Sequence, residues 1–200
     1  MGLLSDRGIK ARIRLKAGDP NRLRISGFSP KLVKVRGKPS WGLSCAGYDM
    51  RLANEFLYID PLALSQSERP YLEVGQPAPW ITVKAPFFIL PPGGFVLART
   101  MEYVRVPRDC SGTVYGKSSF ARLAICLNTT LIECEWEGTI TLEISNIGNF
   151  PVKLTAGHGI CQVVFNRFDD PTGAGAVETS YADRGSATYQ GQTGVTVSRV

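Results

Sequence analysis

The sequence has few of the side chains that zinc enzymes require. It contains a single histidine, His158, and its five cysteines show no C-x-x-C spacing. Zinc hydrolases and zinc deaminases bind the metal through His and Cys ligands of the H-x-E and C-x-x-C kind, so we expect no zinc here. An odd number of cysteines at irregular intervals, several within apolar segments, indicates buried thiols in a reducing compartment.

Long apolar runs and blocks of basic residues are also missing. No stretch of about 18 apolar residues occurs, so the sequence predicts no membrane span, and the N-terminal stretch is too interrupted by charge for a secretory signal. Lysine and arginine are scattered, which argues against nucleic acid as a partner. We expect a cytoplasmic protein. Its net charge of +6 favours an anionic ligand, although a mildly basic surface is the alternative.

The pattern that is present is typical of a β protein. Two hundred residues with 44% hydrophobic content suit one domain with a substantial core. Short apolar segments such as ITVKA, FFIL and FVLARTMEYVRV are separated by Gly and Pro turns, which predicts an all-β sandwich or barrel. A short first helix is expected over residues 5–15, and residues 60–79 are expected to form a loop. From residue 169 the composition predicts a mobile tail or lid, ordered only by a ligand or a neighbouring subunit.

A Gly-Lys-Ser-Ser turn is the first candidate for chemistry. Lys117, Ser118 and Ser119 follow a predicted strand, and Arg122 lies in a short helical turn after them. An ammonium group, two hydroxyls and backbone N–H groups at a helix start can surround phosphate oxygens. The Gly-x-x-x-x-Gly lead of a Walker A loop is missing. A purely structural turn is the alternative reading.

Carboxylates form the second candidate group. Glu143 lies in the predicted strand TLEIS, where alternation places it opposite Leu142 and Ile144. On a rigid strand, desolvated by a ligand, it could act as a general base; otherwise it is an ordinary solvent-facing glutamate. Just before this strand, three acids surround a tryptophan in the segment ECEWE. They could hold Mg²⁺ through water near a triphosphate, or form a charged turn.

Several segments in order resemble the dCTP deaminase and dUTPase family. AGYDMRLA is similar to the first shared motif, and FILPPGGFVLARTMEYVRVP with GTVYGKSSFARL is similar to the deaminase version of the second. IECEWEGTITLEISN and GHGICQVVF fall at the third and fourth motifs, and ATYQGQTGVTVSR looks like the deaminase C-terminal signature. The resemblance implies a mainly β, dUTPase-like distorted β-barrel with a few short helices. It also implies a homotrimer with active sites at the subunit interfaces.

The resemblance also implies the roles of individual residues. Glu143 corresponds to the glutamate that activates water to attack carbon 4 of cytosine, and Ser118 and Arg122 to residues that hold the water and the base. Residues 1–168 are expected to form the nucleotide-binding β domain, and residues 169–200 a lid that closes on the triphosphate. The expected substrate-binding residues are Lys117, Ser119, Thr130, Gln162, Tyr181 and Gln192.

The expected function is zinc-independent deamination of dCTP to dUTP and ammonia, with Mg²⁺ carried on the triphosphate and in water-mediated reach of Glu133. The sequence departs from the family where deaminases usually have Arg-Ile-Asp, because it reads Leu131-Ile132-Glu133. Thr188 stands where a lid lysine is common. Two alternatives therefore stay open: a pyrophosphatase acting on dUTP, on dCTP or after deamination, and a non-catalytic nucleotide sensor.

Overall fold

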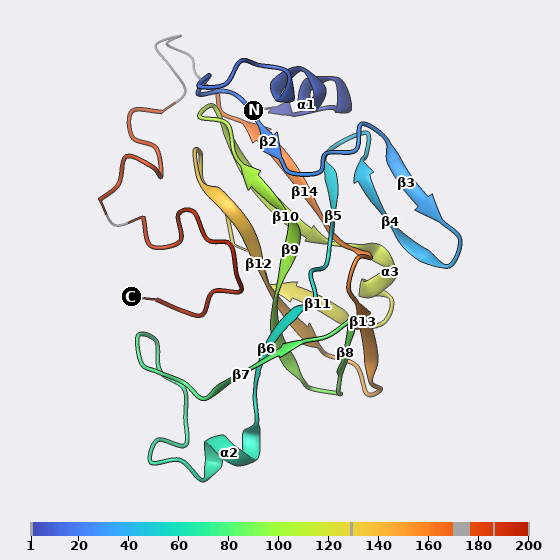
Figure 1. The fold of residues 1–200 in the computed structure, drawn as a ribbon, viewed down its shortest axis with the longest axis vertical. Coiled ribbons are helices and arrows are strands. Elements are labelled where there is room, and N and C mark those ends of the chain that lie inside the picture. The colour runs from blue at the N-terminus through green and yellow to red at the C-terminus, as the bar shows by residue number, and fades with distance from the viewer. Residues whose placement is uncertain (1, 129, 170–176, 186, 200) are drawn as a thin grey trace.

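The chain forms two antiparallel sheets that curl around a common core (Figure 1). The computed structural model describes residues 2–128, 130–169, 177–185 and 187–199. Strands greatly outnumber the short helices among these residues. The mainly β class expected from the sequence is therefore confirmed.

Strand β14 organises the first sheet, because β1, β10 and β5 all pair with it. The sheet continues from β5 through β4 to β3, which form the hairpin that projects from the body in Figure 1. Its strands are β1 (Gly2–Leu3), β3 (Leu32–Val35), β4 (Lys38–Leu43), β5 (Tyr48–Arg51), β10 (Cys110–Gly116) and β14 (Gly159–Arg167).

The second sheet runs in the order β11-β12-β9-β6-β7, with β2 added to β9. A separate two-stranded sheet joins β13 to β8. The strands of the second sheet are β2 (Arg24–Ile25), β6 (Glu55–Ile59), β7 (Trp80–Lys84), β9 (Phe95–Arg105), β11 (Ile125–Asn128) and β12 (Glu137–Asn146). The short pair is β8 (Phe87–Leu90) and β13 (Val152–Thr155).

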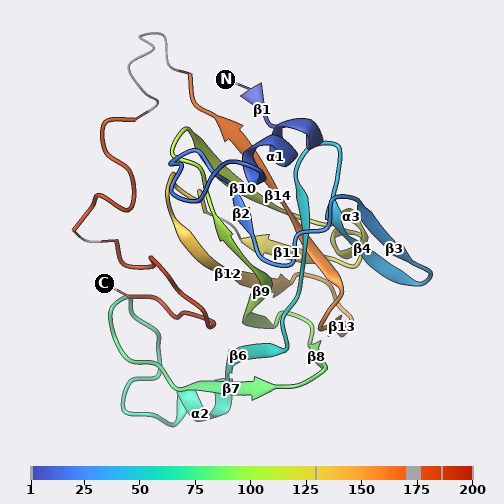
Figure 2. The ribbon, with the colours of Figure 1, turned by 45° about the horizontal axis from the view of Figure 1, so that its top comes forward.

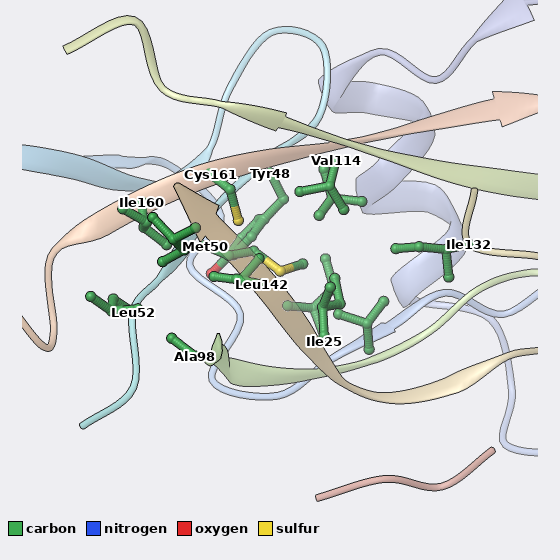
Figure 3. Packing of buried hydrophobic residues seen from close by; sticks show 14 of the residues in the cluster. Ile25, Tyr48, Met50, Leu52, Ala98, Val114, Ile132, Leu142, Ile160 and Cys161 are labelled. Atoms are coloured by element: carbon green, nitrogen blue, oxygen red, sulfur yellow. The ribbon is translucent and has the colours of Figure 1, made fainter. Parts of the chain in front are cut away.

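The core lies between the two sheets (Figure 3). Tyr48 and Met50 of β5, Cys161 of β14 and Leu142 of β12 have no exposed surface. Each large apolar side chain buried in this way contributes roughly 1.5–3 kcal/mol. Because side chains alternate along a strand, burying Leu142 fixes Glu143 on the outer face of the sheet.

The first helix lies where the sequence predicted it, whereas the sequence analysis did not predict the second helix. Helix α1 (Asp6–Ile13) begins after Ser5, whose hydroxyl accepts a hydrogen bond from the Gly8 N–H at 3.3 Å. The segment 60–79 was expected to be a loop, but it contains α2 (Pro61–Ser65). Asp60 caps this helix by accepting from the Leu62 N–H at 2.9 Å, and proline is favourable at the first helical position.

The described part of the C-terminal segment lies against β12 in both ribbon views (Figures 1 and 2). The Thr139 N–H donates to the Gln192 carbonyl at 2.8 Å, and the Gly191 N–H donates to the Glu137 carbonyl at 2.8 Å. The described residues of this segment therefore have hydrogen-bond partners in their own chain, and the expected ordering by a ligand or a neighbouring subunit stays a prediction. Within the described residues no helix is long and apolar enough to cross a membrane.

Candidate active site

The Gly-Lys-Ser-Ser turn connects β10 to a single helical turn, α3 (Ser118–Ala121). Phe120 is buried and anchors the turn, while the Phe120 N–H donates to the Lys117 carbonyl at 2.9 Å. This arrangement leaves Ser118, Ser119 and Arg122 exposed. The turn therefore presents hydroxyls and a guanidinium group to solvent or to a neighbouring molecule.

Lys117 points away from these exposed groups and towards the first sheet. Its ammonium group forms an ion pair with Asp49 and donates to the Ser40 hydroxyl at 3.2 Å. Gln162 of β14 lies directly opposite Asp49 in the β14–β5 register. The fold thus brings Lys117 and Gln162, two of the predicted substrate-binding residues, to the same region beside Asp49.

Glu143 lies on the outer face of β12, opposite Leu97 of β9 and Asn128 of β11. Its side chain is partly buried, and burial raises the pKa of its carboxyl above the ordinary glutamate value, while its own backbone N–H opposes the shift. No other described residue forms a hydrogen bond or ion pair with this carboxylate. An unpaired carboxylate with a raised pKa is a suitable proton acceptor near neutral pH.

The C-terminal segment reaches the same face of β12. Gln192 donates through Nε2 to the Thr139 carbonyl at 2.8 Å and to Thr141 Oγ1 at 3.4 Å. Thr141 and Glu143 share a face because they are two residues apart on one strand. The Gln192 Oε1 atom is buried and has no hydrogen-bond partner among the residues that the structure describes.

The predicted catalytic residues do not all meet within one chain. Glu143 pairs with Asn128, the last residue of β11. The turn that carries Ser118 and Arg122 lies before the other end of this strand, which begins at Ile125. Three residues of extended strand correspond to about 10 Å. Among the described residues, no hydrogen bond joins Glu143 to Ser118 or Arg122. Thr130 is exposed in the loop after β11, close to the Glu143 end of that strand.

The acids before β12 are bound to arginines. Glu135 accepts from Arg105 at 3.0 Å and from Arg108 at 2.6 Å, and Glu133 accepts from Arg184 at 2.7 Å. This corresponds to the charged turn that the sequence left open as an alternative. Glu133 offers oxygen ligands of the kind Mg²⁺ accepts, but Arg184 occupies its carboxylate in this arrangement. Across the described ranges, no three His, Cys, Asp or Glu side chains gather to hold a metal ion.

Sequence reasoning missed the ion pair between Arg99 and Glu55. Arg99 lies opposite Thr141 on the Glu143 face, and its Nε donates to Glu55 at 2.8 Å. Alternation along β9 already places Arg99 on the outer face, so the periodic pattern held a signal for it. Tyr181, a predicted substrate-binding residue, precedes Gln192 in the C-terminal segment. Its hydroxyl accepts from the Tyr189 N–H at 3.1 Å.

Comparisons with known proteins identify the family of the chain. A family model described as dCTP deaminase-like matches residues 3–168. The chain belongs to the dCTP deaminase-like family. A dCTP deaminase of Acidobacterium capsulatum is 38% identical over 208 residues, covering all of both chains. A dCTP deaminase of Gemmatimonas aurantiaca is 40% identical over 201 residues, again covering all of both chains.

A solved structure supports the fold. The crystal structure of 2'-deoxycytidine 5'-triphosphate deaminase from Agrobacterium tumefaciens matches with a TM-score of 0.57 at 21% identity. The match covers 83% of this chain and 48% of that chain, so this chain spans about half the length of that structure. At this identity the comparison confirms the expected fold class.

Proposed function

We propose that this protein is a dCTP deaminase, which converts dCTP and water to dUTP and ammonia. The observation that carries the proposal is Glu143, a partly buried carboxylate with a raised pKa and no described side-chain partner, on the outer face of β12. The chain's membership of the dCTP deaminase-like family supports the same substrate. So does its 38% identity, over its full length, to a dCTP deaminase.

The chemistry assigns both proton transfers to Glu143. The carboxylate removes a proton from water as the water oxygen bonds to carbon 4 of cytosine. As this bond forms, the C4=N3 electron pair moves to N3. The same carboxyl then delivers its proton to the 4-amino nitrogen, the C4–N bond breaks and ammonia leaves. The second water proton passes from the new oxygen to N3 as the C4=O bond of uracil forms. A group that accepts and then donates a proton works best when its pKa lies near the operating pH, which suits a carboxyl raised by burial.

Other residues are assigned to binding. Gln192 is proposed as a substrate contact from the C-terminal segment, since it lies on the face of β12 that carries Glu143. Lys117 and Gln162 lie where they can receive the triphosphate, and Lys117 would exchange Asp49 for phosphate oxygens. Ser119, Thr130 and Tyr181 remain proposed substrate contacts. Mg²⁺ enters as part of the nucleotide complex, since triphosphates carry it.

We also propose a homotrimer in which a neighbouring chain completes each site. The separation of Ser118 and Arg122 from Glu143 along β11 supports this arrangement, because one chain alone does not bring them together. The exposed turn of one chain would face the β12 surface of the next. The five cysteines are free thiols, which fits the cytoplasmic location expected from the sequence.

The defining test is product analysis. Incubating the protein with dCTP and Mg²⁺ should release one ammonia for each dUTP formed, measured by a coupled ammonia assay and by ion-exchange separation of nucleotides. dCMP and pyrophosphate without ammonia would show a pyrophosphatase instead. dUMP with both ammonia and pyrophosphate would show a bifunctional enzyme, and tight binding without any turnover would show a sensor.

The pH dependence of deamination should report the Glu143 pKa. Because the base acts only when deprotonated and burial raises its pKa, kcat/KM should fall as pH decreases through a midpoint above the ordinary glutamate value of 4.5. Stopped assays across the acid range, with a check that the protein stays folded, would measure that midpoint. An acid limb centred at or below 4.5 would contradict the assignment.

A further inference from the structure

A cluster of charged residues joins the loop before β12 to the C-terminal segment. We call residues 133–136 the anchor loop. Glu135, at its centre, has a backbone φ of 59°, a left-handed conformation that non-glycine residues rarely adopt. Its side chain is only 12% exposed, and its carboxylate accepts from both Arg105 and Arg108. The two charge-assisted bonds hold this strained residue in place.

Arg108 connects Glu135 to the C-terminal segment. The same Nη1 atom that donates to Glu135 lies 3.2 Å from Asp183. Asp183 in turn accepts from the Ser180 N–H and from the Ser180 hydroxyl, both at 2.9 Å, which closes a turn at residues 180–183. One arginine therefore links the carboxylate of the anchor loop to the first turn of the segment.

Hydrogen bonds to backbone carbonyls continue this contact towards the active-site face. The Tyr181 N–H donates to the Cys134 carbonyl at 3.1 Å, and the Trp136 indole N–H donates to the Tyr189 carbonyl at 3.0 Å. Gln190 Nε2 donates to the Glu135 carbonyl at 3.0 Å. Two residues beyond Gln190, Gln192 reaches Thr139 and Thr141. The anchor loop thus sets the register of residues 189–192 on β12.

We propose that Glu135, through Arg108 and Asp183, is a positioning residue that holds the C-terminal segment on its own chain before nucleotide binds. The proposal rests on the proposed function, because the segment delivers Gln192 to the face of Glu143. Ordering a segment during binding costs free energy, and a segment that is already ordered avoids that cost. Glu135 therefore acts mainly on the apparent affinity for dCTP rather than on the chemical step.

Kinetics of matched variants test the idea. Glu135→Gln keeps the size of the side chain and removes its charge, and Asp183→Asn does the same at the far end of Arg108. Glu73→Gln is the control, because Glu73 forms an exposed ion pair with Arg69 at 4.0 Å, on the segment 60–79. We expect each of the first two variants to raise KM for dCTP about tenfold with kcat within about twofold.

The double variant and a nucleotide-free measurement complete the test. Glu135→Gln with Asp183→Asn should raise KM by less than the product of the single effects, because both act through Arg108. Without nucleotide, trypsin should cut after Arg184 about tenfold faster in Glu135→Gln than in wild type or Glu73→Gln, as read by intact mass. Residue 135 is far from this peptide bond in sequence, so the change would reflect release of the segment.

The outcomes separate the proposal from its premise. Unchanged KM and unchanged cleavage in Glu135→Gln would overturn the positioning role. A lower kcat with unchanged KM would also overturn it, since that result indicates general damage to the site. A wild-type protein that deaminates nothing would refute the proposed function, while the cleavage measurement would still decide whether Glu135 holds the segment.

Discussion

Replacing Glu143 by glutamine is expected to lower kcat for dCTP deamination by about 10²–10⁴-fold, the range that a general base contributes. Glutamine fills nearly the same volume but cannot accept a proton from water. Nucleotide binding should persist, because no described residue pairs with this carboxylate and its loss leaves no partner unsatisfied. Ammonia release and equilibrium binding of dCTP, measured on the same preparation, would separate the two effects.

A second glutamate on the same strand provides the control. Glu137 begins β12, six residues before Glu143, and its carboxylate contacts the Tyr103 hydroxyl. Glu137→Gln should retain deamination within a few-fold of wild type, because the substitution is chemically identical but lies away from the proposed reaction centre. Full turnover by Glu143→Gln would remove Glu143 from the mechanism and leave the sensor and pyrophosphatase readings to be tested on the remaining residues.

The second large effect is recovery of activity in mixed trimers. Arg122→Ala and Glu143→Gln should each be nearly inactive alone. When the two variants are co-expressed with different tags and trimers carrying both tags are purified, about one site in three should combine an intact Glu143 with an intact Arg122 turn. Such trimers are therefore expected to show about a third of wild-type activity, because each cyclic trimer of two chain types has one interface of that composition.

This recovery requires a site shared between chains. Doubly tagged trimers made only of Glu143→Gln chains should stay at background, which controls for carry-over of wild-type enzyme. If each site were built within one chain, no mixed trimer would contain an intact site and activity would remain at background. Size-exclusion chromatography with light scattering would show whether the trimer forms at all.

Local patterns were enough to predict most of the fold. Ser5 identified the start of α1, and alternation of apolar residues placed Leu142 inside and Glu143 outside. The two-proline, two-glycine turn at residues 91–94 also follows local rules, since Gly93 adopts a φ of 68°. Helix α2 was missed because the polar, proline-rich composition of its segment outweighed the capping signal of Asp60.

The partners of the charged residues could not be predicted in this way. Arg108 and Asp183 are 75 residues apart in sequence, and Lys117 and Asp49 are 68 apart. Which charges meet depends on how the sheets pack, and no short-range pattern contains that information. The sequence therefore showed the acids of the anchor loop as a cluster. Their arginine partners could be identified only from the folded structure. The expected departure from the family at residues 131–133 includes Glu133, which accepts from Arg184 of the C-terminal segment.

The pairing of β1 with β14 has a consequence for the synthesis of the protein. Gly2 lies opposite Arg167, so the first strand made must wait for nearly the last strand of the domain. At about 5–20 residues per second on the ribosome, this wait is on the order of ten to thirty seconds. Strands β5 and β10 pair with the same strand, so the edge of each that faces β14 stays unpaired from its own synthesis until β14 is made. The first sheet therefore cannot be completed until its fourteenth strand has been synthesised.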